Sequence, residues 1–467
     1  MIVYDRLYIG GVWTAPAHPG PLDIRSPHDR SLLGRAAQAA PGDADVAVAT
    51  ARAAFNSGPW PHMDPEERQE VIRRVDGLRE ERAAEAAARV SAATGTPRRF
   101  ADAEQASLTR RVDACLKAAE EQGWEETVRS RDPSPGFDTI VRREAVGVVA
   151  AVIPLQCPFS AATARLTPAL LAGNTVILKA TPENSLSMGL LAELYAEAGL
   201  PEGTLSVLPA DRDTGEYLVS HPDVDAIAFT GSTRAGRRVA ALAGEQLKRV
   251  RLELGGKAAA IVLDDADLAR TVRGLFASLG DNGRMCAART RVLAPRRRYE
   301  EVVAAVADAV RSLKVGDPAD PDTSIGPMAG RERRERLMSY IDLGIEEGAR
   351  PVTGGSSRVP AGLEEGYYVT PTVLADVDHR MRIAQDEISG PVLTVIAHDG
   401  DDDAVRMAND SEYRMSGGVW SADLERAVSV ARRLRTGAVA VNGTATGLDG
   451  TAGLDGYVVH RTITRPR

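Results

Sequence analysis

Helix-patterned stretches alternate along the chain with short runs of β-branched and other apolar residues. Residues 43–91 are rich in Ala, Arg and Glu with apolar positions at helical spacing, and Gly58, Pro59 and Pro61 divide this stretch into at least two helices. Residues 146–153 are a continuous apolar run, which indicates a strand buried on both faces. This alternation is typical of an α/β protein built on a parallel sheet.

Two βαβ units are predicted after this point. In the first, residues 146–153 form a strand, residues 161–171 a helix and residues 175–178 the next strand. In the second, residues 226–229 form a strand, residues 231–236 a glycine turn, and a helix runs from Arg237 onward. Backbone N–H groups at such a helix start can bind a pyrophosphate. The two glycines of the turn are a weak signal alone, because any tight βα connection carries them.

Composition and charge exclude several classes of function. The chain has 467 residues, about three domain lengths, and 43% of them are hydrophobic. Its formal net charge of -8, from 57 basic and 65 acidic residues, offers no basic patch for nucleic acid or anionic lipid. The N-terminus lacks a signal-peptide pattern and no apolar run approaches membrane-spanning length, so we expect a cytoplasmic protein without membrane contact.

The three cysteines, Cys115, Cys157 and Cys286, are predicted to be free thiols. Their spacing does not fit a zinc site, and we expect no metal. Cys286 follows the segment Leu252-Glu253-Leu254-Gly255-Gly256-Lys257, so one thiol and one carboxylate lie in two glycine-marked segments. A cysteine can attack a carbonyl carbon, and a nearby carboxylate can activate the water that hydrolyses the resulting thioester. Arg284 and Arg289 or Arg291 are candidates for an electropositive setting that favours the thiolate.

Segments along almost the whole chain resemble the NAD(P)-dependent aldehyde dehydrogenase superfamily. They occur in the family's order, at residues 7–13, 143–148, 168–179, 229–233, 252–257, 282–289 and 386–392. The resemblance implies a Rossmann-type cofactor domain (residues 1–123 and 146–255), an α/β catalytic domain (residues 256–442) and a small β oligomerisation extension (residues 124–145 and 443–467). It also implies a homodimer or homotetramer, with the tail strand beside a hairpin that turns at residues 133–136.

The resemblance assigns roles to single residues. Cys286 is the expected nucleophile, Glu253 the general base and Gln156 the side-chain donor to the oxyanion. Lys179 is expected to contact the adenosine ribose and Glu387 the nicotinamide ribose, although a solvated lysine and a turn-stabilising carboxylate also explain them. The other expected cofactor contacts are Ile153, Pro154, Thr181, Gly231, Ser232, Gly236 and Leu254.

The chain also departs from the family pattern around the substrate. Gln156 stands where the family has asparagine, which keeps the donor but lengthens its reach. Small residues replace the aromatic side chains that line the family's substrate tunnel, which predicts a wide tunnel and a bulky aldehyde; a chain with only 4% aromatic residues explains this deficit equally well. Asp281 and Arg284 are expected to add polar contacts near the mouth. The small tunnel positions are Cys157, Ala161, Ala164 and Gly280.

Two further departures concern the C-terminus and the cofactor. The family's glycine-rich substrate loop is largely missing between residues 443 and 456, which indicates an open site or one that another chain completes. Pro182 occupies the place of a ribose-binding glutamate, and Glu183 follows it. NAD is the expected cofactor and NADP is not excluded. Arg234 favours an extra phosphate only if it points inward, and an exposed side chain is the ordinary state.

The predicted function is oxidation of an aldehyde to the carboxylic acid through a thiohemiacetal and a thioester on Cys286. Three alternatives use the same residues differently. A coenzyme A-acylating or thioester-reducing enzyme resolves the thioester with a thiol, and a hydrolase uses the thiol without a cofactor. A catalytically impaired nucleotide-binding descendant is suggested by Gln156 and the shortened C-terminus.

Overall fold

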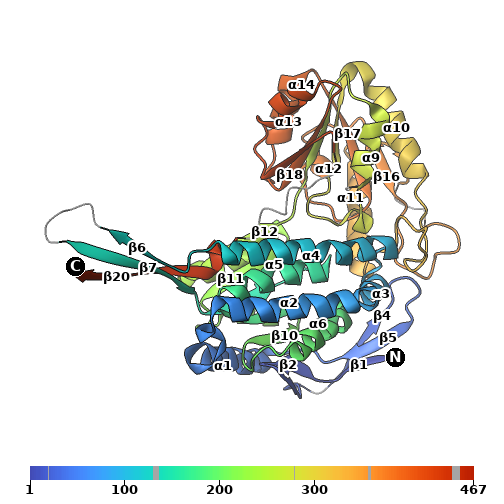
Figure 1. Cartoon of the computed structure of the whole chain (residues 1–467). Coiled ribbons are helices and arrows are strands. Elements are labelled where there is room, and N and C mark those ends of the chain that lie inside the picture. Colours follow the sequence, from blue (N-terminus) through green and yellow to red (C-terminus); the bar gives the residue numbers. More distant parts are fainter. Residues whose placement is uncertain (19, 130–135, 278, 356–358, 444–452, 467) are drawn as a thin grey trace.

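Seven strands form the first large sheet of the molecule, which lies in the lower lobe of Figure 1. The computed structural model describes residues 1–18, 20–129, 136–277, 279–355, 359–443 and 453–466. The strand order is β12-β11-β8-β9-β10-β2-β3, and the five strands from β12 to β10 are parallel. The strands are β2 (Leu7–Ile9), β3 (Val12–Thr14), β8 (Val148–Val152), β9 (Thr175–Ala180), β10 (Leu205–Pro209), β11 (Ala226–Gly231) and β12 (Arg249–Leu254).

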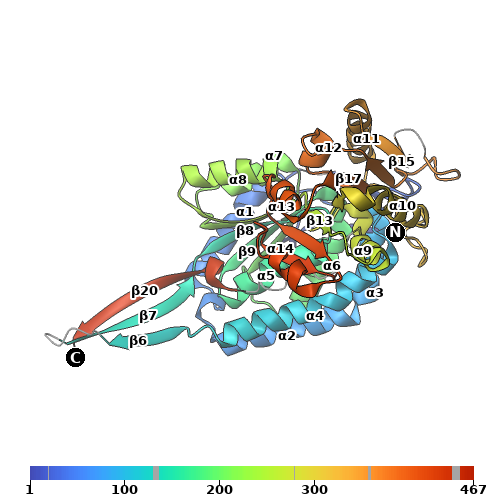
Figure 2. The same ribbon diagram turned by 90° about the horizontal axis from the view of Figure 1, so that it is seen from above.

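Both faces of this sheet are buried, because successive side chains of a strand point to opposite faces. Val149 and Ala151 of β8 pack into the core under one helical layer, and Val148 and Ala150 pack into the core under the other. The first layer holds α2 (Pro65–Glu81), α3 (Ala83–Thr94), α4 (Arg98–Glu120), α5 (Pro158–Leu171) and α6 (Ser185–Glu197). The second layer holds α1 (Pro41–Ser57), α7 (Arg212–Ser220) and α8 (Thr233–Glu245), and Figure 2 shows the sheet between the two layers.

The second large sheet lies in the upper lobe of Figure 1 and has the order β15-β16-β17-β14-β13-β18-β19. Its strands are β13 (Ala259–Val262), β14 (Arg291–Pro295), β15 (Arg350–Thr353), β16 (Thr372–Ala375), β17 (Val392–His398), β18 (Ser416–Trp420) and β19 (Ala438–Val441). Helices α9 (Leu268–Ala277) and α10 (Tyr299–Arg311) cover one face. The other face is covered by α11 (Arg331–Glu346), α12 (Arg382–Gln385), α13 (Asp401–Asn409) and α14 (Leu424–Ala431).

Two three-stranded sheets complete the fold. One joins β1 (Ile2–Tyr4), β5 (Leu32–Ala36) and β4 (Leu22–Arg25). The other is an arm that extends from the lower lobe and carries the C-terminus (Figure 1). In this arm β7 (Phe137–Ala145) pairs antiparallel with β6 (Glu125–Arg129) and with β20 (Val458–Pro466), so the tail strand pairs with the hairpin of its own chain. The hairpin turn predicted at residues 133–136 falls mostly outside the described residues.

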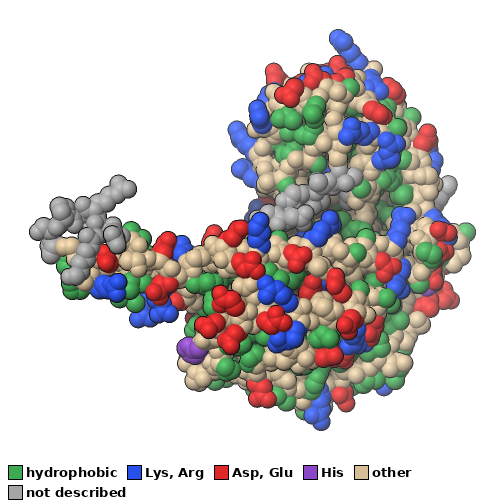
Figure 3. Space-filling view, in the orientation of Figure 1, with side chains coloured by type: hydrophobic (Ala, Val, Ile, Leu, Met, Phe, Trp, Pro, Cys, Tyr) green, Lys and Arg blue, Asp and Glu red, His purple; other side chains and the backbone are tan. Residues whose placement is uncertain are grey.

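The predicted elements occur where the sequence placed them, with shifted ends. The predicted helix at residues 161–171 begins earlier, at Pro158, and the helix expected from Arg237 begins at Thr233. The glycine turn is therefore shorter than predicted, because Ser232 caps the helix directly after β11. None of the helices in the described part of the chain is both long and apolar enough to cross a membrane. Charged side chains of both signs are interspersed over the face that Figure 3 shows.

Candidate active site

The structure brings Cys286 and Glu253 together where the two lobes meet. Glu253 lies near the end of β12, the edge strand of the first sheet, and Cys286 follows the short helical turn Asp281–Gly283. Gly256 lies against the backbone of Cys286, and a Cβ atom there would clash with the Cys286 carbonyl oxygen. The charge of Glu253 also raises the pKa of Cys286. The two glycine-marked segments of the sequence therefore form one site.

The surroundings of Cys286 are apolar and acidic. Burial raises the pKa of its thiol, and the charges of Glu253 and Glu387 raise it further, while backbone N–H groups of Ala287 and of Cys286 itself act in the opposite direction. The thiol is therefore protonated at neutral pH unless a base or a bound ligand changes its setting.

The predicted electropositive setting from neighbouring arginines is wrong. Arg284 forms an ion pair with Asp281, and Arg289 donates to the carbonyl of Gly417 at 3.2 Å. Arg291 donates to the carbonyl of Lys257 at 2.9 Å. All three guanidinium groups bind elsewhere in the fold, because a buried arginine must satisfy its donors.

Asp281 and Arg284, which we predicted to add polar contacts near the mouth of the substrate tunnel, are both buried. Asp281 is 0% exposed and Arg284 5% exposed, and Asp281 accepts a further hydrogen bond from Thr96 Oγ1 at 2.6 Å. Arg284 Nη1 donates to the carbonyl of Thr94 at 2.7 Å. These contacts tie the loop before Cys286 to the end of α3. The pair is therefore part of the support beneath the nucleophile.

Gln156 lies in the loop between β8 and α5, beside the second thiol of the site. Its Nε2 donates to Ser389 Oγ at 3.4 Å. Cys157, the next residue, adopts a left-handed backbone conformation with φ of 46° and precedes the first residue of α5 without capping it. Burial raises the pKa of Cys157, and the charges of Glu104, Asp281 and Cys286 add to this effect. The oxyanion role of Gln156 stays a prediction.

Helix α4 supplies two residues that the sequence analysis missed. Glu104 accepts a hydrogen bond from the backbone N–H of Ser160 at 3.0 Å, and so caps the first turn of α5 in place of Cys157. Phe100, one turn earlier on α4, lies against Gly280, where a Cβ atom would clash with its ring. Phe100 thus fills space that we predicted to be open at Gly280. Only their four-residue spacing on one helix face linked Phe100 and Glu104 in the sequence.

The other small residues that we predicted to line the tunnel lie on α5 or directly before it. Ala161 and Ala164 lie on α5 and are both half-buried, and Cys157 is half-buried at the start of that helix. Ala161 also packs against the core of the lower lobe. Small side chains are therefore present along α5, whereas the ring of Phe100 occupies the space beside Gly280.

The glycine turn after β11 leads directly into the N-terminus of α8. Ser232 Oγ accepts a hydrogen bond from the backbone N–H of Ala235 at 3.4 Å. Gly236 lets α8 approach the end of β12, because a Cβ atom there would clash with the side chain of Leu254. Arg234 is exposed. The exposed end of α8 therefore offers backbone donors and a favourable dipole beside Gly231 and Leu254.

Glu387 reaches this helix end from the upper lobe. Its carboxylate lies against Gly255, where a Cβ atom would clash with it, and the N–H of Thr233 lowers its pKa. Burial nevertheless raises the pKa of Glu387 overall, although Arg336 and Lys257 act in the opposite direction. Its position between the two lobes fits a ligand that spans them.

The carboxyl ends of β8 and β9 present the remaining predicted cofactor residues. Lys179 is 7% exposed, and burial lowers its pKa to about 8 while Asp211 opposes this shift. The backbone N–H of Ile153 donates to the carbonyl of Lys179 at 3.0 Å, which joins the two strand ends before Pro154. Thr181 Oγ1 is buried and has no hydrogen-bond partner among the described residues. An unpartnered buried hydroxyl beside a lysine fits the polar groups of a dinucleotide.

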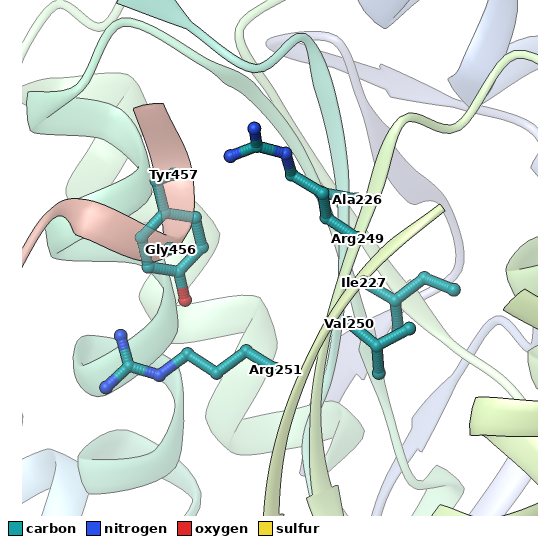
Figure 4. Close-up of a pocket in the computed structure, with 7 residues that line it drawn as sticks. All are labelled: Ala226, Ile227, Arg249, Val250, Arg251, Gly456 and Tyr457. Carbon is teal, nitrogen blue, oxygen red and sulfur yellow. The ribbon is translucent and has the colours of Figure 1, made fainter. Parts of the chain in front are cut away.

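Glu253 has two cationic neighbours that the sequence analysis did not assign to the site. Nη2 of Arg165 and Nη2 of Arg251 each lie 3.8 Å from Glu253 Oε1. The guanidinium carbon of Arg251 lies 5.9 Å from the centroid of the Tyr457 ring. Arg251 also borders a cavity at the outer edge of β12, and Figure 4 shows it there with Tyr457 and Arg249. The sequence offered one signal for Arg251: it lies two residues before Glu253 on the same strand, so the two side chains share a face.

This fold and this pairing of thiol and carboxylate define an aldehyde dehydrogenase, and the chain belongs to the Aldehyde dehydrogenase family, which it matches over residues 13–457. It is 44% identical over 444 residues to a geranial dehydrogenase of Castellaniella defragrans, covering 95% of this chain and 91% of that protein. The crystal structure of a Mycobacterium tuberculosis aldehyde dehydrogenase complexed with NAD+ matches with a TM-score of 0.95 and 41% identity, over 99% of this chain and 98% of the other.

An indole-3-acetaldehyde dehydrogenase of P. syringae in complex with NAD+ matches with a TM-score of 0.93 and 34% identity, over 100% of this chain and 97% of the other. These relatives confirm the predicted fold class and the predicted oxidoreductase activity. The chain is an NAD-dependent aldehyde dehydrogenase.

Proposed function

We propose that this enzyme oxidises a bulky, largely apolar aldehyde to its carboxylic acid, with Cys286 as nucleophile and Glu253 as general base. The observation that carries these roles is the close approach of the Glu253 segment to Cys286, which Gly256 permits. Cys286 is the thiol of the site whose pKa responds to Glu253. Both residues therefore lie in one electrostatic environment, as covalent catalysis followed by hydrolysis requires.

The steps assign one task to each residue. The Cys286 thiol releases its proton to water as its sulfur attacks the aldehyde carbon. The oxygen of the resulting tetrahedral adduct receives hydrogen bonds from the Gln156 amide and from backbone N–H of the nucleophile loop. A bound NAD would supply the hydride acceptor, so that the thiohemiacetal on Cys286 becomes a thioester. Glu253 then takes a proton from water as the water oxygen attacks the thioester carbon. The carbon–sulfur bond breaks, the acid leaves, and the Cys286 thiol regains a proton.

The arrangement of groups around the cleft supports the predicted cofactor contacts. The N-terminus of α8 with Ser232 would hold the pyrophosphate, and Lys179 and Thr181 would hold the adenosine ribose. Glu387 would hold the nicotinamide ribose from the other lobe. Glu183 pairs with Arg333 at 3.3 Å near Lys179 and places a carboxylate beside the adenosine end. This charge opposes a 2′-phosphate, so NAD is preferred over NADP.

The proposed substrate class rests on the small residues along α5. Cys157, Ala161 and Ala164 leave room beside the nucleophile, while Phe100 offers an aromatic surface at Gly280. A small aldehyde would leave this volume unfilled and lose contact energy. Relatives named as geranial and indole-3-acetaldehyde dehydrogenases agree with this size class.

The active form is a homodimer or homotetramer. The three-stranded arm extends away from the lower lobe, and large apolar side chains stay exposed on it. Exposed examples are Val128, Phe137 and Ile463. Association with a second copy would cover them.

The first experiment measures reduction of NAD or NADP by the purified protein with aldehydes that range from small aliphatic to bulky aromatic and terpenoid. We expect kcat/KM to be highest for bulky apolar aldehydes with NAD, and Cys286→Ala to abolish turnover. Highest kcat/KM for small aldehydes would contradict the proposed substrate class. Full turnover by Cys286→Ala would contradict the covalent mechanism.

A further inference from the structure

Arg251 and Arg165 hold the carboxylate of Glu253 between them. Each places Nη2 at 3.8 Å from Glu253 Oε1, and their side chains are 25% and 4% exposed. The guanidinium of Arg165 is also bound by Thr230, because its Nε and Nη2 donate to Thr230 Oγ1 at 3.0 and 2.7 Å. Arg251 lies on the same face of β12 as Glu253, since side chains two residues apart on a strand share a face.

The C-terminal tail in turn positions Arg251. Nη1 of Arg251 lies 3.5 Å from the carbonyl oxygen of Gly453, and its guanidinium lies over the Tyr457 ring. Two residues earlier on β12, Arg249 donates to the carbonyl of Val458 at 2.7 Å. The tail that leads into β20 is therefore fastened to the strand that carries Glu253. A cavity of about 350 Å³ lies beside these arginines and Tyr457 (Figure 4).

We propose that Arg251 is a positioning residue for Glu253, which keeps the carboxylate oriented to accept a proton from the water that hydrolyses the thioester. This inference rests on the proposed role of Glu253 as general base. A general base must lie within reach of the proton that it accepts, and a charged neighbour fixed in the fold restricts the orientations of the carboxylate. Arg251 therefore increases the rate of deacylation.

Other charged and titratable groups also face this carboxylate. Arg165 approaches from α5, Tyr457 from the tail and the Cys286 thiol from the upper lobe, with Glu387 across that thiol. Burial raises the pKa of Tyr457, so this phenol is neutral at physiological pH. Arg165 remains when Arg251 is changed, so the loss of Arg251 weakens but does not remove the contacts that orient the carboxylate.

The test follows the lifetime of the acyl-enzyme across pH by rapid quenching and intact-mass measurement, after a single turnover with excess NAD. This readout isolates deacylation whichever step limits kcat. In Arg251→Gln we expect the deacylation rate to fall about tenfold, because a poorly oriented carboxylate is a less effective general base. Arg251→Lys retains the positive charge and should restore most of the wild-type profile.

Arg249→Gln is the matched control, because Arg249 lies on the same strand and binds the same tail without contacting Glu253. Its deacylation rate should equal that of the wild type. An unchanged deacylation rate in Arg251→Gln, or an equal loss in Arg249→Gln, would overturn the inference. Thermal melting of each variant reports folding separately, and Arg251→Met, which keeps the aliphatic stem but not the charge, repeats the test if the glutamine variant does not fold.

Failure of the underlying mechanism gives a different result. If Glu253 is the general base, Glu253→Gln accumulates acyl-enzyme that decays slowly at every pH. Normal decay in Glu253→Gln would remove that role, and the Arg251 inference with it. Slow decay in Glu253→Gln together with a wild-type profile in Arg251→Gln would overturn the Arg251 inference alone.

Discussion

Cys286 and Glu253 influence each other through charge as well as chemistry. Burial raises the pKa of the Cys286 thiol, and the nearby Glu253 carboxylate raises it further. Removing that negative charge should therefore lower the thiol pKa and increase the thiolate fraction at neutral pH. We expect Glu253→Gln to be alkylated at Cys286 by iodoacetamide several-fold faster than the wild type at pH 7, measured without cofactor by peptide mass spectrometry.

Glu126→Gln is a suitable control for this measurement, because Glu126 lies on the arm strand β6. Its alkylation rate should match the wild type. Slower alkylation of Glu253→Gln would show instead that Glu253 acts as the base that deprotonates the thiol in the free enzyme.

Mutation can separate the proposed oxyanion role of Gln156 from its contact with Ser389. If its amide donates to the oxyanion, Gln156→Ala should lower the rate of the first hydride transfer by about 10²–10³. Stopped-flow detection of reduced nicotinamide measures this step. Ser389→Ala removes the amide's contact in the structure, which is long at 3.4 Å, and should cost far less. Equal, small effects of both changes would leave Gln156 with a structural role only.

Single residues of the site were predictable where they lie within a motif, and not where they act across the fold. Cys286 and Glu253 could be paired from their glycine-marked segments. The partners of Arg284 and Arg289 could not be predicted. They are Asp281 and the carbonyl of Gly417, and these contacts depend on how loops pack. A buried guanidinium takes whichever acceptors the fold offers, and sequence spacing does not show them.

At the scale of elements, α4 and α5 meet through a buried carboxyl group. Burial raises the pKa of Glu104 to about 8, and the Asp281 charge adds to this while the Ser160 N–H opposes it. The neutral acid is therefore favoured in the folded state relative to the unfolded chain, whose ordinary glutamate pKa is about 4.3. The resulting stability is fully present below that value and is lost as pH rises through about 8.

The expected result is a melting temperature that falls between pH 5 and pH 8.5 in the wild type and falls less in Glu104→Gln. Glutamine keeps a carbonyl acceptor for the Ser160 N–H but does not ionise. A difference of about 2–4 °C at the alkaline end corresponds to roughly 1 kcal/mol in a domain of this size. Differential scanning calorimetry measures it, and parallel curves for both proteins would contradict a titrating Glu104.

The order and type of the elements were predictable, whereas their contacts at the site were not. Continuous apolar runs identified β8 and β9, because strands buried on both faces cannot alternate with polar residues. The start of α8 was placed four residues late, since Ser232 capping was not considered. The contact of Phe100 with Gly280 joins α4 to a distant loop, and no local pattern reports it.

At the scale of the whole molecule, β12 lies between the cleft of the two lobes and the arm. The first sheet and α8 face the second lobe across Gly255 and Glu387, so the proposed cofactor site depends on how the lobes meet. The arm continues from a tail that Arg249 and Arg251 fasten to β12. An enzyme that associates through this arm therefore connects its subunit contacts to the strand that carries Glu253.

The last prediction tests that association. Val128 on β6 is 51% exposed and Ile463 on β20 is 40% exposed, and both lie on outer strands of the arm whose backbone edges are open in one chain. Charged side chains at such positions oppose strand-edge and apolar association. Val128→Lys/Ile463→Lys should therefore shift the protein from a dimer or tetramer to single chains in light scattering, with an unchanged circular dichroism spectrum. Val12→Lys is the control, because Val12 is 52% exposed but lies on β3, at the opposite edge of the first sheet from β12. If Val128→Lys/Ile463→Lys keeps the molar mass of the wild-type assembly in light scattering, the enzyme associates through another surface.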